Sequence, residues 1–158
     1  MPKTNDPARG LFLKLKKRGV TIAVAESCTG GLVSGLLTDI PGVSKVFDGA
    51  IVAYSNEVKT RILKIPREII DDYGAVSAET AEFMAYGVRI MCGADIGISV
   101  TGIAGPAGGS AKKPVGLAHL GFSSKKKVIS KKILLKGTRL ELKQKFALAL
   151  LKFSEKNT

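Results

Sequence analysis

The sequence is poor in several kinds of residue that particular protein classes require. It has no tryptophan, a single histidine and two cysteines among 158 residues. No apolar run approaches the roughly 18 residues of a membrane-spanning helix, and the polar start of the chain lacks the apolar centre of an export signal. Cys28 and Cys92 lie far apart without C-x-x-C spacing, which favours a reduced cytosolic protein. We therefore expect a cytoplasmic protein that does not insert into membranes.

Acidic residues are scarce in the last third of the chain. Residues 1–110 contain 12 basic and 11 acidic side chains, whereas residues 111–158 contain 13 basic ones and only Glu141 and Glu155. This last segment carries almost all of the net charge of +12. A positive field attracts nucleic acid, anionic lipid or a phosphorylated small molecule, and the charge alone does not choose among them.

The remaining composition is typical of one globular domain. Hydrophobic residues, mostly aliphatic, make up 45% of the chain, and its 18 glycines are spread throughout. A chain of this length matches a prior of about 150 residues per domain and should bury roughly 70% of its unfolded surface. We expect residues 1–158 to form a single domain, without a disulfide or metal to stabilise it.

Stretches of strand length alternate with helical stretches along the whole chain. Strands are expected at residues 21–25, 46–54, 94–100, 115–122 and 127–135. Capping residues and helix breakers predict helices at 7–19, 32–37, 55–63 and 77–92, with two more that open at 66 and 138. The last two strands form a hairpin and must be antiparallel. The expected fold is a three-layer α/β domain with a mixed sheet.

Apolar spacing predicts which faces of the terminal helices are buried. Leu11, Leu13 and Leu15 lie amid basic residues and predict an amphipathic first helix that ends at Gly19. Thr138 and Glu141 have the spacing of a capping box at the start of the last helix. That helix places four apolar residues on one stripe, namely Leu142, Phe146, Leu150 and Phe153.

Two glycine-rich loops, at residues 26–31 and 101–110, follow predicted strands. In open α/β sheets the carboxyl edge of the strands is where ligands usually bind. The first loop runs into a helix, whose free N–H groups would face a ligand there. Neither loop matches a named phosphate-binding motif, so a tight turn remains the alternative interpretation of each.

Ser27 is a candidate nucleophile at the end of the first strand. A Ser-His-Asp triad is not expected, because His119 lies within an apolar strand and is interpreted as a hydrogen-bonded core residue. The sequence also has no cluster of His, Cys and carboxylates that would bind catalytic zinc. Cys28 is the alternative nucleophile if the helix terminus lowers its pKa, and a buried, inert thiol otherwise.

Lys59 is the remaining candidate base. A lysine accepts a proton at neutral pH only if its pKa falls by roughly 2–3 units. Burial and the positive end of a helix both lower it, and Lys59 is expected in the first turns of a short helix. Glu57 would act in the opposite direction. The alternative is an ordinary solvated lysine.

Five segments follow one another along the chain: Ala25-Glu-Ser-Cys-Thr-Gly-Gly31, Tyr54-Ser-Asn-Glu-Val-Lys59, Gly74-Ala-Val-Ser77, Thr101-Gly-Ile-Ala-Gly-Pro106 and Lys113-Pro-Val-Gly116. Together, over residues 8–153, they closely resemble the CinA C-terminal domain family. Its members hydrolyse nicotinamide mononucleotide to nicotinate mononucleotide and ammonia. The resemblance implies a three-layer α/β/α sandwich with a mixed five-stranded sheet, a homo-oligomer, and a Ser–Lys mechanism without metal or cofactor. In many relatives a larger N-terminal domain precedes this one, whereas here we expect the domain to stand alone.

The resemblance also implies roles for individual residues. It assigns the nucleophile to Ser27, the base to Lys59 and a neighbouring catalytic tyrosine to Tyr54. The expected substrate-binding residues are Thr29, Gly30, Gly31, Thr101, Gly102, Gly105 and Arg139. The first three would offer N–H groups to a developing oxyanion, and Arg139 with the later loop would hold the 5′-phosphate.

This chain departs from the family pattern at three positions. Ala107 stands in place of an aspartate in the common Gly-Pro-Asp-Gly-Gly, and Thr138 stands in place of an aspartate before Arg139. Lys143 stands where the family has a further arginine. These changes affect the expected hydrogen bonding of the loop and the substrate preference, but they leave Ser27 and Lys59 in place.

Two other functions remain open from the sequence alone. A nucleic-acid-binding module is suggested by the lysines of the last third, although aromatic residues are sparse there and no RNA- or DNA-binding signature is present. A non-catalytic homologue would bind the mononucleotide without turning it over. Nucleic acid is the less expected partner, and a small-molecule substrate the more expected one.

Overall fold

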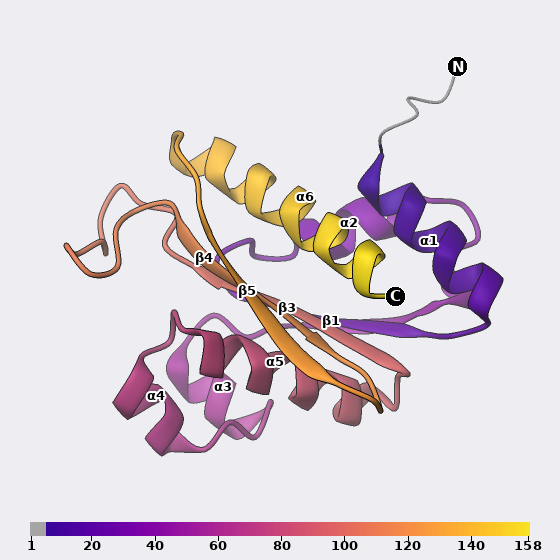
Figure 1. Cartoon of the computed structure of the whole chain (residues 1–158), viewed down its shortest axis with the longest axis horizontal. Helices are drawn as coiled ribbons and strands as arrows, with labels where there is room; N and C mark the ends of the chain where they lie inside the picture. The colour runs from indigo at the N-terminus through magenta and orange to yellow at the C-terminus, as the bar shows by residue number, and fades with distance from the viewer. Residues whose placement is uncertain (1–5) are drawn as a thin grey trace.

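The chain is built around a five-stranded mixed sheet in the order β2-β1-β3-β4-β5, in a computed structural model that describes residues 6–158 (Figure 1). The strands are β1 (Ile22–Glu26), β2 (Phe47–Val52), β3 (Ile96–Gly102), β4 (Leu117–Ser123) and β5 (Val128–Leu134). β1 runs parallel to β2 and β3, whereas β4 is antiparallel to β3 and β5. All five predicted strands and the antiparallel hairpin are confirmed.

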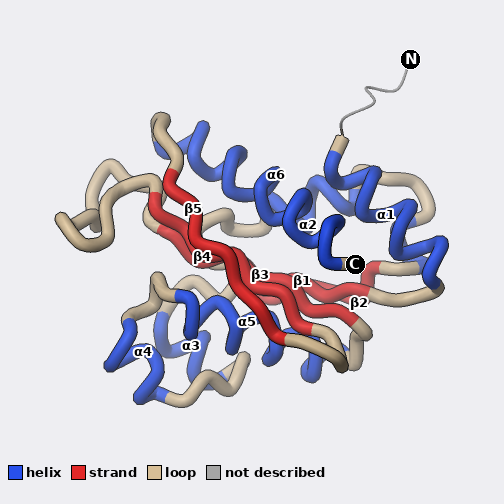
Figure 2. The backbone as a smooth tube through the Cα atoms, viewed as in Figure 1, coloured by secondary structure: helices blue, strands red, loops and turns tan. Residues whose placement is uncertain are grey.

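Helices cover both faces of this sheet (Figure 2). They are α1 (Pro7–Arg18), α2 (Leu32–Thr38), α3 (Asn56–Arg61), α4 (Arg67–Tyr73), α5 (Ala78–Cys92) and α6 (Arg139–Asn157), with an unpredicted short 3-10 helix η1 (Val43–Lys45). α1, α2 and α6 lie on one face, and α3, α4 and α5 on the other. The fold is therefore the expected α/β/α sandwich. No helix described between residues 6 and 158 has the length and apolar character needed to cross a membrane.

The helices begin where capping residues predicted. The side chains of Asp6, Ser55 and Ser77 accept N–H groups from the first turns of α1, α3 and α5. Thr138 and Glu141 form the two reciprocal bonds of a capping box at the start of α6. Each cap satisfies N–H groups that have no partner within the helix and typically stabilises it by about 1 kcal/mol. The cap at Ser55 fixes the start of the helix that carries Lys59.

The apolar face of α1 does not include Leu13, one of the leucines that predicted an amphipathic helix. Leu11 and Leu15 are buried, but Leu13 is 52% exposed and its neighbour Phe12 is buried instead. With 3.6 residues per turn, residues two apart point about 200° apart around a helix, so 11, 13 and 15 cannot share one face. The apolar face instead repeats every three or four residues, as at Ala8, Leu11, Phe12 and Leu15.

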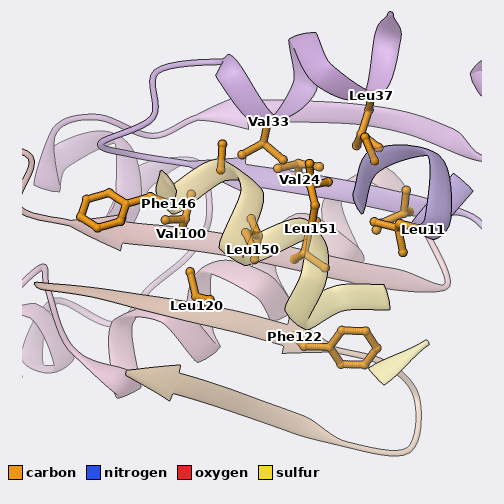
Figure 3. Packing of buried hydrophobic residues seen from close by; sticks show 14 of the residues in the cluster. Leu11, Val24, Val33, Leu37, Val100, Leu120, Phe122, Phe146, Leu150 and Leu151 are labelled. Carbon is orange, nitrogen blue, oxygen red and sulfur yellow. The ribbon is translucent and has the colours of Figure 1, made fainter. Parts of the chain in front are cut away.

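The larger hydrophobic cluster lies between the sheet and the layer of α1, α2 and α6 (Figure 3). It joins alternate strand residues to α6 and includes Val24, Val100, Leu120, Phe146 and Leu150. Ala23 and Ala25 belong to a second, smaller cluster, which also contains residues of α5. β1 therefore buries both of its faces, and this explains why it is a continuous apolar run rather than an alternating one.

Close contact between α5 and the sheet depends on two glycines. A Cβ atom at Gly97 of β3 would overlap the carbonyl oxygen of Ala85, and one at Gly121 of β4 would overlap the carbonyl oxygen of Ala81. The absent side chains let α5 lie directly on the central strands, beside the strand that leads into the glycine-rich loop.

The three parallel strands end at the same edge of the sheet, and backbone hydrogen bonds connect the residues at and just after their carboxyl ends. The Ser27 N–H donates to the Val100 carbonyl at 3.1 Å, and the Ala53 N–H donates to the Glu26 carbonyl at 2.8 Å. The chain segments that follow β1 and β2 therefore start side by side. In open α/β sheets this edge is the usual place for a ligand.

Phe146→Ala is expected to lower the free energy of unfolding by about 3–5 kcal/mol, because Phe146 is fully buried and its truncation leaves a cavity. The measurement is urea denaturation followed by circular dichroism. Leu140→Ala on the same helix is the matched control, since Leu140 is 71% exposed and its truncation should change stability by less than about 0.5 kcal/mol. Equal losses in the two variants would contradict this description of the core.

Candidate active site

A pocket of about 260 Å³ opens at the carboxyl edge of the parallel strands. Five parts of the chain line it: the loop after β1, the start of α3 with the turn before it, the segment before α5, the end of β3 with the loop that follows, and the start of α6. The lining residues are Ser27, Cys28, Tyr54, Asn56, Lys59, Ala75, Val76, Thr101, Gly102, Ile103, Ala104, Gly105, Ala107, Gly108 and Arg139. Among these residues, all within the described part of the chain, there is no Asp or Glu.

Ser27 and Lys59 meet within this pocket. Ser27 follows the last residue of β1, and Lys59 lies in α3, which begins after a three-residue turn that follows β2. The Lys59 Nζ atom is 3.0 Å from the Ser27 Oγ atom. The parallel pairing of β1 with β2 brings these residues together, although they are 32 positions apart in the sequence.

The Lys59 amino group is buried without a counter-charge. The residue is 1% exposed, and Nζ donates to the carbonyl oxygens of Ala53 at 2.8 Å and Tyr54 at 3.0 Å. Burial lowers the pKa of Lys59 to about 8, because it disfavours the charged form. Glu57, which could have raised the pKa, instead lies near the guanidinium groups of Arg61 and Arg67.

Cys28 also lines the pocket but is held as a thiol. It is 7% exposed, and burial is the main reason why the pKa of its thiol rises to about 12. A backbone hydrogen bond of Cys28, and after it Lys59 and Lys143, lower the pKa but do not overcome this effect. A thiol with so high a pKa is a weak nucleophile at neutral pH, so the inert interpretation of Cys28 is favoured over the reactive one.

The first glycine-rich loop turns its N–H groups inward. The Gly31 N–H donates to the Glu26 carboxylate at 3.0 Å, and the Gly30 N–H donates to the Ser27 carbonyl at 3.1 Å. The hydroxyl of Thr29 also donates to Glu26, at 2.6 Å. The expectation that the N–H groups of Gly30 and Gly31 face a ligand was therefore wrong, because groups of the loop itself accept them. The Thr29 N–H has no acceptor among residues 6–158, although Thr29 is not one of the lining residues.

The second glycine-rich loop contributes Thr101, Gly102 and Gly105 to the lining, and their role in substrate binding stays a prediction. The Thr101 hydroxyl donates to the Ala75 carbonyl at 2.7 Å and so ties the loop to the segment before α5. A Cβ atom at Gly102 would lie 2.7 Å from the Cβ of Ala118, so this glycine also serves close packing.

Arg139 joins three parts of the pocket wall. It is the first residue of α6, and its guanidinium donates to the Gly105 carbonyl at 2.7 Å and to the Tyr54 hydroxyl at 3.2 Å. Tyr54 is 60% exposed at the rim, while its backbone carbonyl faces Lys59. Thr138, which stands where the family has an aspartate, still caps α6 through its side chain. Ala107 lies in the lining and brings no charge to it.

Some lining residues were not predicted. Asn56 is the first residue of α3 and lies three positions before Lys59, so the two share one side of the helix. That spacing could have identified it. Ala75 and Val76 belong to a segment that carried the family resemblance, but no polar side chain there indicated a role.

His119 lies away from the pocket, in β4, and is 9% exposed. Its core position is confirmed. The expected hydrogen bond is not found at Nδ1, which has no partner among residues 6–158. Burial, with Lys132 and Lys113 nearby, lowers the pKa of His119 and favours the neutral ring. The described residues contain no group of three His, Cys, Asp or Glu side chains that could hold a metal ion.

The sequence of the chain matches known proteins over most of its length. The family model of the CinA C-terminal domain matches residues 5–157. A CinA-like protein of Dictyoglomus thermophilum is 54% identical over 125 residues, which are 79% of this chain and 30% of that protein. The chain thus spans 30% of the length of this curated relative.

Solved structures share the fold over nearly the whole chain. The competence/damage inducible protein CihA from Agrobacterium tumefaciens matches with a TM-score of 0.91 and 37% identity, covering 97% of this chain and 94% of that one. The competence damage-inducible protein A (ComA) from Klebsiella pneumoniae matches with a TM-score of 0.92 and 27% identity, covering 98% and 96%. By sequence and by fold, the chain belongs to the CinA C-terminal domain family.

Proposed function

We propose that this chain hydrolyses the carboxamide of nicotinamide mononucleotide to give nicotinate mononucleotide and ammonia, with Ser27 as nucleophile and Lys59 as base. The observation that carries the proposal is the 3.0 Å contact between Lys59 Nζ and Ser27 Oγ in a pocket where the amino group has no carboxylate partner. A buried amine of lowered pKa beside a hydroxyl is the arrangement that a serine nucleophile needs when no histidine is available.

The hydrogen bonds of Lys59 determine the direction of proton transfer. A neutral amine has two N–H groups and one lone pair, and the carbonyls of Ala53 and Tyr54 can accept both N–H groups. The lone pair is then left for the hydroxyl proton of Ser27. The ammonium form would instead donate its third proton to Ser27 and leave the hydroxyl without a base. Both carbonyls hold the nitrogen in place in either state.

The reaction proceeds in two halves. Ser27 Oγ attacks the carboxamide carbon while its proton moves to Lys59 Nζ, and a tetrahedral oxyanion forms. Lys59 then returns the proton to the departing nitrogen, the C–N bond breaks, and ammonia leaves a nicotinoyl ester on Ser27. A water molecule, deprotonated by Lys59, hydrolyses this ester, restores the hydroxyl and gives the carboxylate product. Of the three predicted oxyanion donors, Thr29, Gly30 and Gly31, the Thr29 N–H is the one whose hydrogen is not accepted within residues 6–158, so it stays a candidate donor.

The charge of the pocket suits a nucleotide. Arg139 presents a guanidinium among lining residues that include no carboxylate, and a guanidinium can bind a phosphate through two parallel hydrogen bonds. The Thr101–Gly105 loop lies beside it, as its bond to the Gly105 carbonyl indicates. The Tyr54 hydroxyl bonds to Arg139, so we assign Tyr54 to holding Lys59 through its carbonyl and to substrate contact at the rim.

Assembly into a homo-oligomer and a cytoplasmic location stay predictions.

Purified protein should release ammonia from nicotinamide mononucleotide, and Ser27→Ala should lower that rate by about 10³-fold or more because no nucleophile remains. The measurement is an ammonia-coupled assay, with circular dichroism to confirm an intact fold. Cys28→Ala is the matched control and should retain activity. Full activity in Ser27→Ala would refute the proposal, and binding without turnover in the unaltered protein would identify a non-catalytic homologue.

The rate should depend on pH through Lys59. Below a pKa of about 8 the amino group is an ammonium that cannot accept a proton, so kcat/KM should rise about tenfold per pH unit and level off above pH 8. The measurement is the pH–rate profile, with NMR titration of isotope-labelled lysine to follow Lys59 directly. Lys59→Arg supplies the assignment, since its spectrum lacks that signal. A profile that breaks near pH 10 would contradict a buried amine.

Arg139→Met should raise KM for the nucleotide by about 10–100-fold, because a charge-assisted bond to phosphate contributes roughly 1.5–3 kcal/mol. The same change should have little effect on the phosphate-free nucleoside, and steady-state kinetics on both substrates measure the difference. Lys152→Met is the control, since Lys152 is an exposed lysine of the same helix outside the pocket. Equal effects on nucleotide and nucleoside would exclude Arg139 from phosphate binding.

A further inference from the structure

Glu26 is a fully buried carboxylate beside the proposed nucleophile, and the mechanism above does not use it. It is 0% exposed at the end of β1. Its Oε2 atom accepts the Thr29 hydroxyl at 2.6 Å and the N–H groups of Gly31 and Val33 at 3.0 and 3.1 Å. Its Oε1 atom accepts the N–H and the hydroxyl of Ser34, at 2.8 and 2.6 Å. Three of these donors are backbone N–H groups, which can only donate, so the arrangement fits an ionised carboxylate.

These hydrogen bonds cap the first N–H groups of α2 with a carboxylate that lies in the protein interior. The chain leaves β1, turns through residues 27–31 and brings the first turn of α2 back onto the carboxylate of the residue where it started. The Glu26 carbonyl is fixed as well, because the Ala53 N–H donates to it at 2.8 Å. Ser27 therefore follows a residue that is held at both its backbone and its side chain.

The carboxylate also changes the electrostatics of Cys28. A thiol next to the start of a helix ordinarily has a lowered pKa, because the helix end favours the thiolate. Here a negative charge occupies that helix end. Burial is the largest cause of the raised pKa of the thiol, and a backbone hydrogen bond of Cys28 lowers it. The charged groups facing Cys28 are Glu26 of β1, Lys59 of α3 and Lys143 of α6; among them Glu26 raises the pKa by a smaller amount, and the two lysines lower it.

We propose that Glu26 is a positioning residue that holds Ser27 opposite Lys59 and, by occupying the start of α2, keeps the adjacent Cys28 as an unreactive thiol. The part that concerns Ser27 rests on the proposed amide hydrolysis. The part that concerns Cys28 does not depend on any turnover, so the two can fail separately.

The test is Glu26→Gln, which keeps the shape of the side chain but removes its charge and replaces one acceptor with an NH₂ group. Alkylation of each cysteine by iodoacetamide is followed against pH by mass spectrometry of the peptides. In the unaltered protein the rate at Cys28 should show no inflection below about pH 10. In Glu26→Gln it should be severalfold faster at pH 7.5, because the thiolate fraction rises as the pKa of the thiol falls. Cys92, outside the pocket lining, is the internal reference and should not change.

Two further variants distinguish the effect of the Glu26 charge from the effect of its side-chain length and from a general loss of structure. Glu26→Asp keeps the charge but is shorter, so it should leave Cys28 slow to react and yet lower kcat for the mononucleotide about tenfold or more, with KM changed less than about threefold. Asp95→Asn is the matched control, because Asp95 accepts the Thr21 N–H at 3.0 Å before β1 and β3, at the opposite edge of the sheet. It should leave both kcat and Cys28 reactivity unchanged.

Several outcomes would overturn the proposal. Unchanged Cys28 alkylation in a folded Glu26→Gln protein would remove the electrostatic role, and unchanged kcat in both Glu26 variants would remove the positioning role. If Glu26→Gln does not fold, the unaltered protein can still overturn the electrostatic part, since an inflection at Cys28 below about pH 8.5 would show an ordinary or activated thiol. If the unaltered protein hydrolyses no mononucleotide, the proposed function fails while the alkylation result still stands.

Discussion

The amino group of Lys59 is held at 2.8–3.0 Å by two backbone carbonyls and one hydroxyl, with no carboxylate beside it. Burial alone would make an ammonium unstable here, and a carboxylate would stabilise it and remove its basicity. Carbonyl dipoles act between these limits, because they orient the nitrogen without supplying a full negative charge. The site therefore depends on keeping acidic residues out of reach, and Glu57, two positions away, lies instead beside Arg61 and Arg67 at the surface.

The scaffold supplies this environment from a very short stretch of chain. The carbonyls of Ala53 and Tyr54 belong to the turn between β2 and α3, and the cap at Ser55 makes the chain turn at once into the helix that carries Lys59. The lysine thus folds back onto the turn that precedes its own helix. Ser27 arrives separately, from β1, and parallel pairing of β1 with β2 sets its distance from this turn. Two neighbouring strand ends and one helix cap are enough to bring Ser27 and Lys59 into contact.

Much of this arrangement could be predicted from local sequence signals. Caps such as Ser55 and Thr138 marked helix starts, and the family resemblance paired Ser27 with Lys59 as nucleophile and base. The sequence could not show which way the N–H groups of residues 29–31 point, because an acidic residue before a glycine-rich turn can face solvent or fold inward. It also could not place Arg139 against Tyr54, since that contact joins positions 85 apart through the packing of α6. Leu13 lies off the apolar face of α1 for a simpler reason, that residues two apart on a helix point in nearly opposite directions.

Because the Glu26 side chain points into the protein, the two glycine-rich loops have different roles. A carboxylate within the same chain is always present at high effective concentration, so it competes strongly with any external anion for the start of α2. With that helix end filled, the first loop sets the geometry of Ser27, and under the proposed function the loop after β3 and Arg139 are the groups that would bind the substrate phosphate. The pocket is consistent with this division, because Thr101, Gly102 and Gly105 line it whereas Gly30 and Gly31 do not. Variation in the second loop, as at Ala107, can therefore alter which substrate is bound without disturbing the contact between Ser27 and Lys59.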